Sequence, residues 1–135
     1  MGLCNLRHVD REIAKRKAVN DRYRMHLEGV SGLQLNPVQK DVTPNYAYFP
    51  VFFDEEVFGA SRDDVFAELA KHHIGARKYF YPITTAFACY KDIYDPVETP
   101  VALKLSRQVM TVPMYADLAL GDVDRICEII LSCRK

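Results

Sequence analysis

The sequence predicts an α+β fold in which helices cover a small, mostly antiparallel sheet. Short strands are predicted at 33–35, where apolar and polar residues alternate, and at 46–53, 76–81 and 109–112, which contain β-branched or aromatic residues. These strands are not each separated by a helix, as a parallel sheet would require. Other stretches carry apolar residues at the spacings of three and four that indicate amphipathic helices. A chain of 135 residues, 49% hydrophobic and 27% charged, also has the size and composition of one globular domain, which we place at residues 1–135.

A long helix is predicted over residues 3–28, because no glycine or proline interrupts them before Gly29. Arg16 and Asn20 interrupt its apolar stripe, so we expect this helix to lie along a larger body and not within a small core. Its excess of basic residues is typical of a solvated helix face. The α+β body is then expected at residues 31–135.

The strongest predicted strand is 46–53, which has aromatic and β-branched residues on both faces and follows a short strand at 33–35. Pro50 cannot donate a backbone hydrogen bond to a neighbouring strand. We therefore expect the strand 46–53 to lie at an edge of the sheet or to carry a bulge.

The next helix is predicted to begin after Ser61, because Ser61 and Asp64 have the spacing of a capping box. It continues with an amphipathic pattern and is expected to end at Gly75. Residues 76–81 are then short, aromatic and extended, and Pro82 ends them.

The last part of the chain begins with an irregular stretch at 83–99, a length that in compact domains is often functional. A helix is predicted over 100–106, since Thr99 is a suitable N-cap and proline follows it. A strand at 109–112 and a final helix from about 120 to 133 complete the fold.

Charge and cysteine content exclude several kinds of partner. Eighteen basic and eighteen acidic residues give no net charge and a pI near 6.9, so we expect neither a nucleic acid nor an anionic membrane as partner. No apolar run is long enough to cross a bilayer. The four cysteines show no clustered spacing, which favours reduced thiols and a cytoplasmic location.

Motifs of catalysis and metal binding are not found. His72 and His73 are adjacent, and neighbours on a helix point about 100° apart, so the pair is poorly placed to ligate one metal ion. Cys127 and Cys133 fall on the apolar stripe of the last helix and are expected in the core. We therefore predict no catalytic, cofactor-binding or metal-binding residue in this chain.

The candidate substrate-binding residues are Arg77, Tyr79 and Tyr81, beside the irregular stretch. Alternation in an extended segment puts these three on one face, with Lys78 and Phe80 on the other and Phe80 anchored in the core. Guanidinium groups bind phosphate oxygens, and tyrosine rings stack on bases or sugars, so the set suits a nucleotide-sugar. The alternative is a structural edge strand whose charges reach solvent.

Several short motifs follow one another along essentially the whole chain. They are Met1-Gly2-Leu3, the helical run 10–18 with Tyr23, the block 75–82, Leu105-Ser106, Val112-Pro113-Met114-Tyr115 and Asp122-Val123-Asp124-Arg125-Ile126. Together they resemble the C-terminal small domain of the DegT/StrS family of pyridoxal-phosphate-dependent sugar aminotransferases. The block 75–82 is similar to members that aminate dTDP-linked keto-deoxysugars.

This resemblance implies a fold like the C-terminal domain of fold-type-I pyridoxal-phosphate enzymes. It implies a nucleotide-sugar substrate, an amino donor such as glutamate, a homodimer, and a large domain that precedes this chain, carries the cofactor and its lysine, and packs against the helix 3–28. No lysine here matches the family's cofactor lysine, so the chain is expected to be a fragment that binds no cofactor and is inactive alone. It departs from the family at Ala119, where a capping Thr or Ser is usual.

Two kinds of function therefore remain open. In the first, the chain supplies one wall of a substrate cleft through Arg77, Tyr79 and Tyr81. In the second, it is a free-standing interaction module without catalytic activity, and the segment 77–81 and the first helix dock a partner chain.

Overall fold

The computed structural model describes residues 2–90 and 92–135. Met1 and Lys91, which fall within the predicted domain 1–135 and the irregular stretch 83–99, lie outside the described residues. In chain order the elements are α1 (Gly2–Leu6), α2 (Val9–Leu27), β1 (Leu33–Leu35), β2 (Phe49–Phe53), α3 (Glu55–Phe58), α4 (Arg62–Lys71), β3 (Arg77–Lys78), the 3-10 helices η1 (Thr84–Ala86) and η2 (Pro96–Glu98), α5 (Pro100–Gln108), β4 (Val109–Val112) and α6 (Leu120–Ser132). The predicted α+β class is confirmed.

The four strands form one antiparallel sheet in the order β1-β2-β4-β3. Residues that lie opposite each other in such a sheet share a face. Val51 lies opposite Met110 and Phe49 opposite Val112, and these four side chains are buried. On the other face, Pro50 and Arg77 both lie opposite Thr111.

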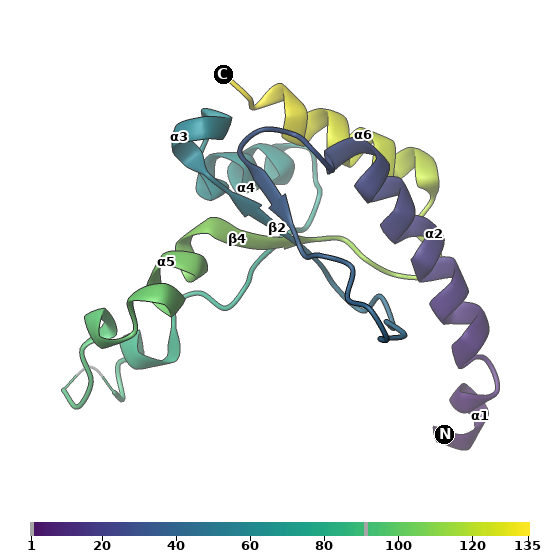
Figure 1. The fold of residues 1–135 in the computed structure, drawn as a ribbon, viewed down its shortest axis with the longest axis horizontal. Helices are drawn as coiled ribbons and strands as arrows, with labels where there is room; N and C mark the ends of the chain where they lie inside the picture. The colour runs from purple at the N-terminus through teal and green to yellow at the C-terminus, as the bar shows by residue number, and fades with distance from the viewer. Residues whose placement is uncertain (1, 91) are drawn as a thin grey trace.

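Helices α2, α4 and α6 cover the face of Val51 and Met110, and Figure 1 shows the three helices on the same side of the sheet. Their contributions to the core include Tyr23 of α2, Leu69 of α4 and Ile130 of α6, all fully buried. Since each element donates a strip of apolar residues to one shared core, the chain has the layered arrangement that its sequence predicts.

The prediction for the strand of Pro50 is wrong in one respect. β2 is an inner strand, between β1 and β4, and it begins at Phe49, so residues 46–48 are outside it. Pro50 is tolerated because β1 pairs with β2 only as far as Leu35 opposite Val51. On the β1 side, Pro50 therefore lies beyond the end of the pairing, where a missing donor costs least.

The first helix also differs from the prediction. A turn at Arg7 and His8 separates α1 from α2, so the helix is not continuous over residues 3–28. The C-terminal half of α2 belongs to the chain's own core through Val19, Tyr23 and Leu27, each four residues after the last. The apolar stripe that enters the core is thus confined to the C-terminal half of α2. The apolar pattern averaged over the whole helix did not reveal it.

Helix α4 begins as predicted. The Ser61 hydroxyl accepts a hydrogen bond from the backbone N–H of Asp64, and the Asp64 carboxylate accepts one from the Ser61 N–H at 3.0 Å, which completes the capping box. The helix ends at Lys71, earlier than Gly75, because His73 adopts a positive φ of 60° that a right-handed helix does not allow.

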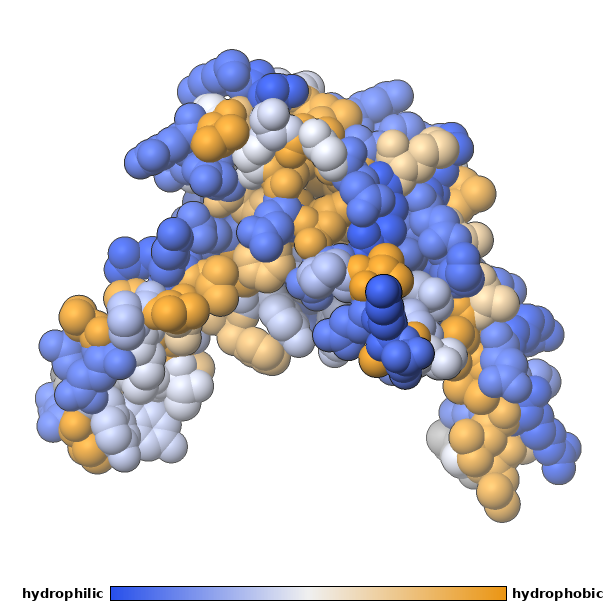
Figure 2. Space-filling model, in the orientation of Figure 1, coloured by the Kyte–Doolittle hydropathy of each residue, from blue (hydrophilic) through white to orange (hydrophobic). Residues whose placement is uncertain are grey.

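Two extensions diverge from the helix-and-sheet body in Figure 1: α1 with the start of α2, and the segment that carries η1, η2 and α5. Figure 2 shows apolar residues gathered on both of them. Leu3 is 81% exposed and Val101 71%. Among the described residues, none of the helices combines the length and the hydropathy that a membrane span needs.

Candidate functional site

A groove lies between helix α2 and the loop 36–48, beside the turn that follows β3. We call it the tyrosine groove; its volume is about 740 Å³. Its lining includes Lys17, Asp21 and Arg24 of α2, Tyr46 and Tyr48 of the loop, and Tyr79 of the turn. A concave site with aromatic walls and a few charged groups is suited to a small polar ligand with a flat ring.

Two arginines of α2 hold the loop of the tyrosine groove. Arg16 donates a hydrogen bond to the carbonyl oxygen of Asn45 at 3.0 Å, and Arg24 donates one to the carbonyl oxygen of Asn36. The loop is therefore fixed to the helix near both of its ends. Arg16, which interrupts the apolar stripe of the helix, thus has a partner in the loop.

Tyr46 occupies an unusual backbone conformation within this loop, with φ of 51°. A bulky residue at positive φ is an outlier that costs on the order of 1–3 kcal/mol and persists only where its surroundings impose it. Residues in such conformations are concentrated at functional sites, and Tyr46 lines the tyrosine groove.

Tyr79 projects from the turn toward Tyr48, and the two ring centroids are 5.6 Å apart. Tyr79 also stacks on Phe80, with centroids 4.1 Å apart. Tyr48 and Tyr79 both line the groove, and aromatic rings of this kind stack on a base or sugar ring.

The charged groups of the groove are one ion pair and one arginine. The ammonium group of Lys17 lies 2.6 Å from the carboxylate of Asp21. This hydrogen bond holds the pKa of Asp21 below its usual value and raises the pKa of Lys17. Lys17 therefore stays protonated, and the pair is neutral as a whole.

The three predicted substrate-binding residues lie close in sequence but do not share one face. Arg77 lies on the sheet face away from the helices and is exposed, Tyr79 lines the tyrosine groove, and Tyr81 lies beside Lys78, 5.6 Å from its ammonium group. The reason is that β3 has only two residues, and a turn at Tyr79 and Phe80 breaks the alternation. Phe80 is 72% exposed, so its predicted place in the core is wrong.

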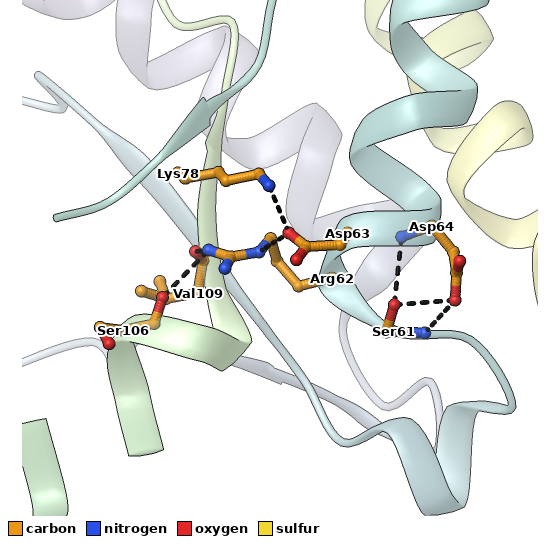
Figure 3. A network of polar contacts seen from close by, with 7 residues as sticks. All are labelled: Ser61, Arg62, Asp63, Asp64, Lys78, Ser106 and Val109. Atoms are coloured by element: carbon orange, nitrogen blue, oxygen red, sulfur yellow. Dashed lines mark hydrogen bonds and ion pairs between the residues drawn. The ribbon is translucent and has the colours of Figure 1, made fainter. Parts of the chain in front are cut away.

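A buried arginine adjoins the turn that carries Tyr79. Arg62 is 2% exposed and donates hydrogen bonds to the carbonyl oxygens of Ser106 at 3.0 Å and Val109 at 2.8 Å, and to the carboxylate of Asp63 at 2.7 Å. Asp63 also binds Lys78 at 2.7 Å, as Figure 3 shows. Burial raises the pKa of Asp63, but the hydrogen bond from Lys78 and the charge of Arg62 outweigh it and keep that pKa below its usual value.

Sequence reasoning missed this buried arginine, because residues 61–64 were interpreted only as a helix cap. A signal was present: Arg62 lies three residues before Val65 and seven before Leu69, and therefore on the buried stripe of α4. A cation on an apolar stripe indicates a buried group that needs several acceptors.

The lysines of the described residues do not fit a covalent pyridoxal phosphate site. Such a lysine must reach its neutral form in a pocket that encloses the cofactor. Four lysines instead bind carboxylates at 2.6–2.7 Å, and three more are exposed. The lysines that bind carboxylates are Lys15, Lys17, Lys71 and Lys78, and the exposed ones are Lys40, Lys104 and Lys135.

Within residues 2–90 and 92–135, no group of three or more His, Cys, Asp or Glu residues could hold a metal ion.

Solved aminotransferases contain the same fold. TlmJ, an aminotransferase from Streptoalloteichus hindustanus, aligns with 98% of this chain and 34% of its own at a TM-score of 0.82, and at 20% identity this likeness shows the fold alone. DesI, solved in the presence of its TDP-sugar product, aligns with 98% of this chain and 34% of its own at a TM-score of 0.88 and 25% identity. The fold is therefore that of about a third of an aminotransferase chain.

The chain belongs to the DegT/DnrJ/EryC1/StrS aminotransferase family, whose model matches residues 1–131. Members of this family depend on pyridoxal phosphate. The dTDP-4-amino-4,6-dideoxy-D-glucose transaminase of Escherichia coli is 33% identical over 97% of this chain, and the GDP-perosamine synthase of Vibrio cholerae is 25% identical over 96%. The chain spans about a third of the length of these curated relatives, 36% and 35%.

Proposed function

We propose that this chain is the small domain of a pyridoxal-phosphate-dependent aminotransferase that acts on a nucleotide-linked keto-deoxysugar, with a dTDP-sugar as substrate. A large domain supplies the cofactor lysine, and the chain alone neither binds the cofactor nor transaminates. The observation that carries the proposal is the pairing of Tyr79 with Tyr48 on the tyrosine groove, in a chain of this family.

We place the enzyme in the cytoplasm, in keeping with its four free cysteines.

In this proposal the residues of the chain bind and orient the nucleotide-sugar. Arg77 is exposed and makes no ion pair or side-chain hydrogen bond within the described part of the chain, so its five donors are available to a diphosphate. Tyr79 supplies a ring for stacking. Tyr81, two residues further along the chain, contacts Arg62 and Lys78 and takes part through the turn that carries Tyr79. The substrate range is supported by the Escherichia coli relative, a transaminase named for a dTDP-sugar.

The exposed apolar extensions support a second part of the proposal, which concerns partners. Leu3 and Leu6 on α1, and Ile93, Val97 and Val101 on the other extension, are each more than half exposed. Scattered apolar residues are normal on a surface, but groups of them mark interfaces. We propose that they contact the large domain and a second copy of the enzyme.

Titration of the chain with dTDP, followed by NMR on ¹³C-labelled tyrosine rings, tests the substrate class. The eight tyrosines are few enough to assign. We expect the rings of Tyr79 and Tyr48 to shift with a dissociation constant in the millimolar range, because only one wall of the cleft is present, while Tyr115, which is outside the groove, stays unchanged. Equal shifts at Tyr115, or none at Tyr79 and Tyr48, contradict the proposal.

A further inference from the structure

Arg62 makes more contacts than a helix terminus requires. It is the first residue of α4, where an exposed side chain suffices, yet its guanidinium group is buried and reaches two carbonyl oxygens at the junction of α5 and β4. A buried charge is costly unless several acceptors satisfy it, and removal of one partner leaves the other unpaired. The arginine therefore joins α4 to the α5–β4 junction with a defined geometry.

The same guanidinium group also contacts the turn after β3. Its central carbon lies 5.0 Å from the centroid of the Tyr81 ring, and the ammonium group of Lys78 lies 5.6 Å from that ring. Two cations thus contact one aromatic ring, an arrangement that is attractive because the ring faces carry negative potential. Lys78 is itself held by Asp63, the residue that binds Arg62.

The turn has little backbone support of its own. β3 pairs with β4 through only two residues, Arg77 and Lys78, and the chain turns immediately after them. The strand therefore fixes the turn at its N-terminal end, and the Tyr81 ring on Arg62 fixes it at its C-terminal end. Between these two points lies Tyr79, the ring that faces Tyr48 across the rim of the tyrosine groove.

We infer that Arg62 is a positioning residue: it holds Tyr81 and thereby fixes the turn that presents Tyr79 to the substrate groove. The effect on substrate rests on the proposed function, whereas the coupling between Arg62 and Tyr79 does not. Arg62 does not contact the ligand in this scheme, since it is buried beneath Tyr81.

Three variants separate positioning from a general loss of stability. Arg62→Lys keeps the charge but loses the planar fork that binds two carbonyls and faces the ring. Tyr81→Leu removes the ring at a half-exposed site and leaves the Arg62 hydrogen bonds intact. Tyr81→Phe keeps the ring over the guanidinium group and serves as the matched control.

The experiment compares the ¹³C tyrosine-ring resonances of Tyr79 and Tyr48 in the complete 135-residue chain, without nucleotide and then with dTDP. We expect Arg62→Lys and Tyr81→Leu to shift both resonances in the free chain, and Tyr81→Phe to leave them in place. We expect each of the first two variants to weaken dTDP binding about five-fold, and the double variant to weaken it no further, since both act through one contact.

Unchanged Tyr79 and Tyr48 resonances in the free Tyr81→Leu chain overturn the inference, as does an additive loss of dTDP affinity in the double variant. If Arg62→Lys fails to fold, Tyr81→Leu alone decides, because its site is exposed. If the unaltered chain does not respond to dTDP, the proposed substrate is wrong, and the free-chain resonances still decide whether Arg62 positions Tyr79.

Discussion

Arg22 of α2 donates two hydrogen bonds to the carboxylate of Asp124 of α6, at 2.6 and 2.7 Å. One heptad earlier, Lys15 binds Asp117 at 2.6 Å, and in both pairs the partners are 102 residues apart in sequence. The constant separation means that the two segments run parallel. The two pairs therefore join α2 to α6 and to the turn just before α6 in a single register. Their acidic residues differ in exposure, 27% for the side chain of Asp124 and 78% for that of Asp117.

The first prediction concerns Asp124 and pH. The hydrogen bonds from Arg22 lower the pKa of Asp124 to about 2. A carboxyl group whose pKa is lower in the folded chain stabilises the fold above its unfolded pKa of about 3.9, and that contribution disappears as the pH falls toward 2. We expect Asp124→Asn to lower the urea midpoint at pH 7, and the difference from the unaltered chain to vanish near pH 2. Asp117→Asn, at a far more exposed pair, is the control and should change the midpoint less; an equal change argues against the role of burial.

A second prediction concerns the start of α6. Ala119 occupies the N-cap with extended backbone angles, φ −66° and ψ 137°, but has no side chain with which to cap. Ala119→Ser supplies a hydroxyl in the right place and should raise the free energy of unfolding by about 1 kcal/mol. Ala119→Gly is the control for backbone effects, since glycine caps without a side chain. Urea denaturation measures both, and a serine variant no more stable than the parent contradicts the prediction.

The elements with a clear local signal were predicted well from sequence, as the capping box of Ser61 and Asp64 illustrates. Both partners of that contact lie within one helical turn. The errors concern contacts between distant segments. Pro50 predicted an edge strand or a bulge, because the sequence does not reveal that β1 stops short of this residue. The burial of the C-terminal half of α2 depends on the position of α6, which the sequence does not reveal either.

The candidate site was predictable in part for the same reason. The residue types at 77–81 pointed to the correct stretch, since Tyr79 does line a groove. Alternation could not place the side chains, because the strand ends after Lys78 and a turn follows. The groove itself requires Tyr48 and α2, which lie far from Tyr79 in sequence, and only the folded chain brings them together.

The third prediction concerns the cofactor. The hydrogen bonds that Lys15, Lys17 and Lys71 donate to carboxylates raise the pKa of these amines, so they are poor nucleophiles at neutral pH. We expect mass spectrometry after borohydride treatment with pyridoxal phosphate to show only scattered, substoichiometric labelling of surface lysines. A single lysine labelled one-to-one contradicts the proposal that the cofactor site lies in another domain.

The fourth prediction concerns self-association. With Leu3 and Leu6 exposed on α1, we expect light scattering to give an apparent mass above 15.5 kDa that rises with concentration. The double variant Leu3→Gln, Leu6→Gln should shift the mass toward the monomer, while Val38→Gln, a change of an exposed apolar residue outside both extensions, should not. A constant 15.5 kDa species at all concentrations argues against an interface on these extensions.

The last prediction concerns Arg77 in an active enzyme, made by joining this chain to the large domain of the Escherichia coli relative. Arg77 is exposed and makes no contact that the fold depends on within the described residues, so Arg77→Ala should change the stability of the chain by less than about 0.5 kcal/mol. If its guanidinium group binds the diphosphate, the loss of a charge-assisted hydrogen bond of about 1.5–3 kcal/mol should raise KM for the nucleotide-sugar by roughly 10- to 150-fold. The reaction with the amino donor should change little, because that substrate has no diphosphate. Arg134→Ala, at an exposed arginine near the C-terminus, is the matched control and should leave both reactions unchanged. Equal damage to both reactions in Arg77→Ala, or unaltered kinetics with the nucleotide-sugar, would mean that Arg77 is a surface residue of an edge strand and takes no part in binding.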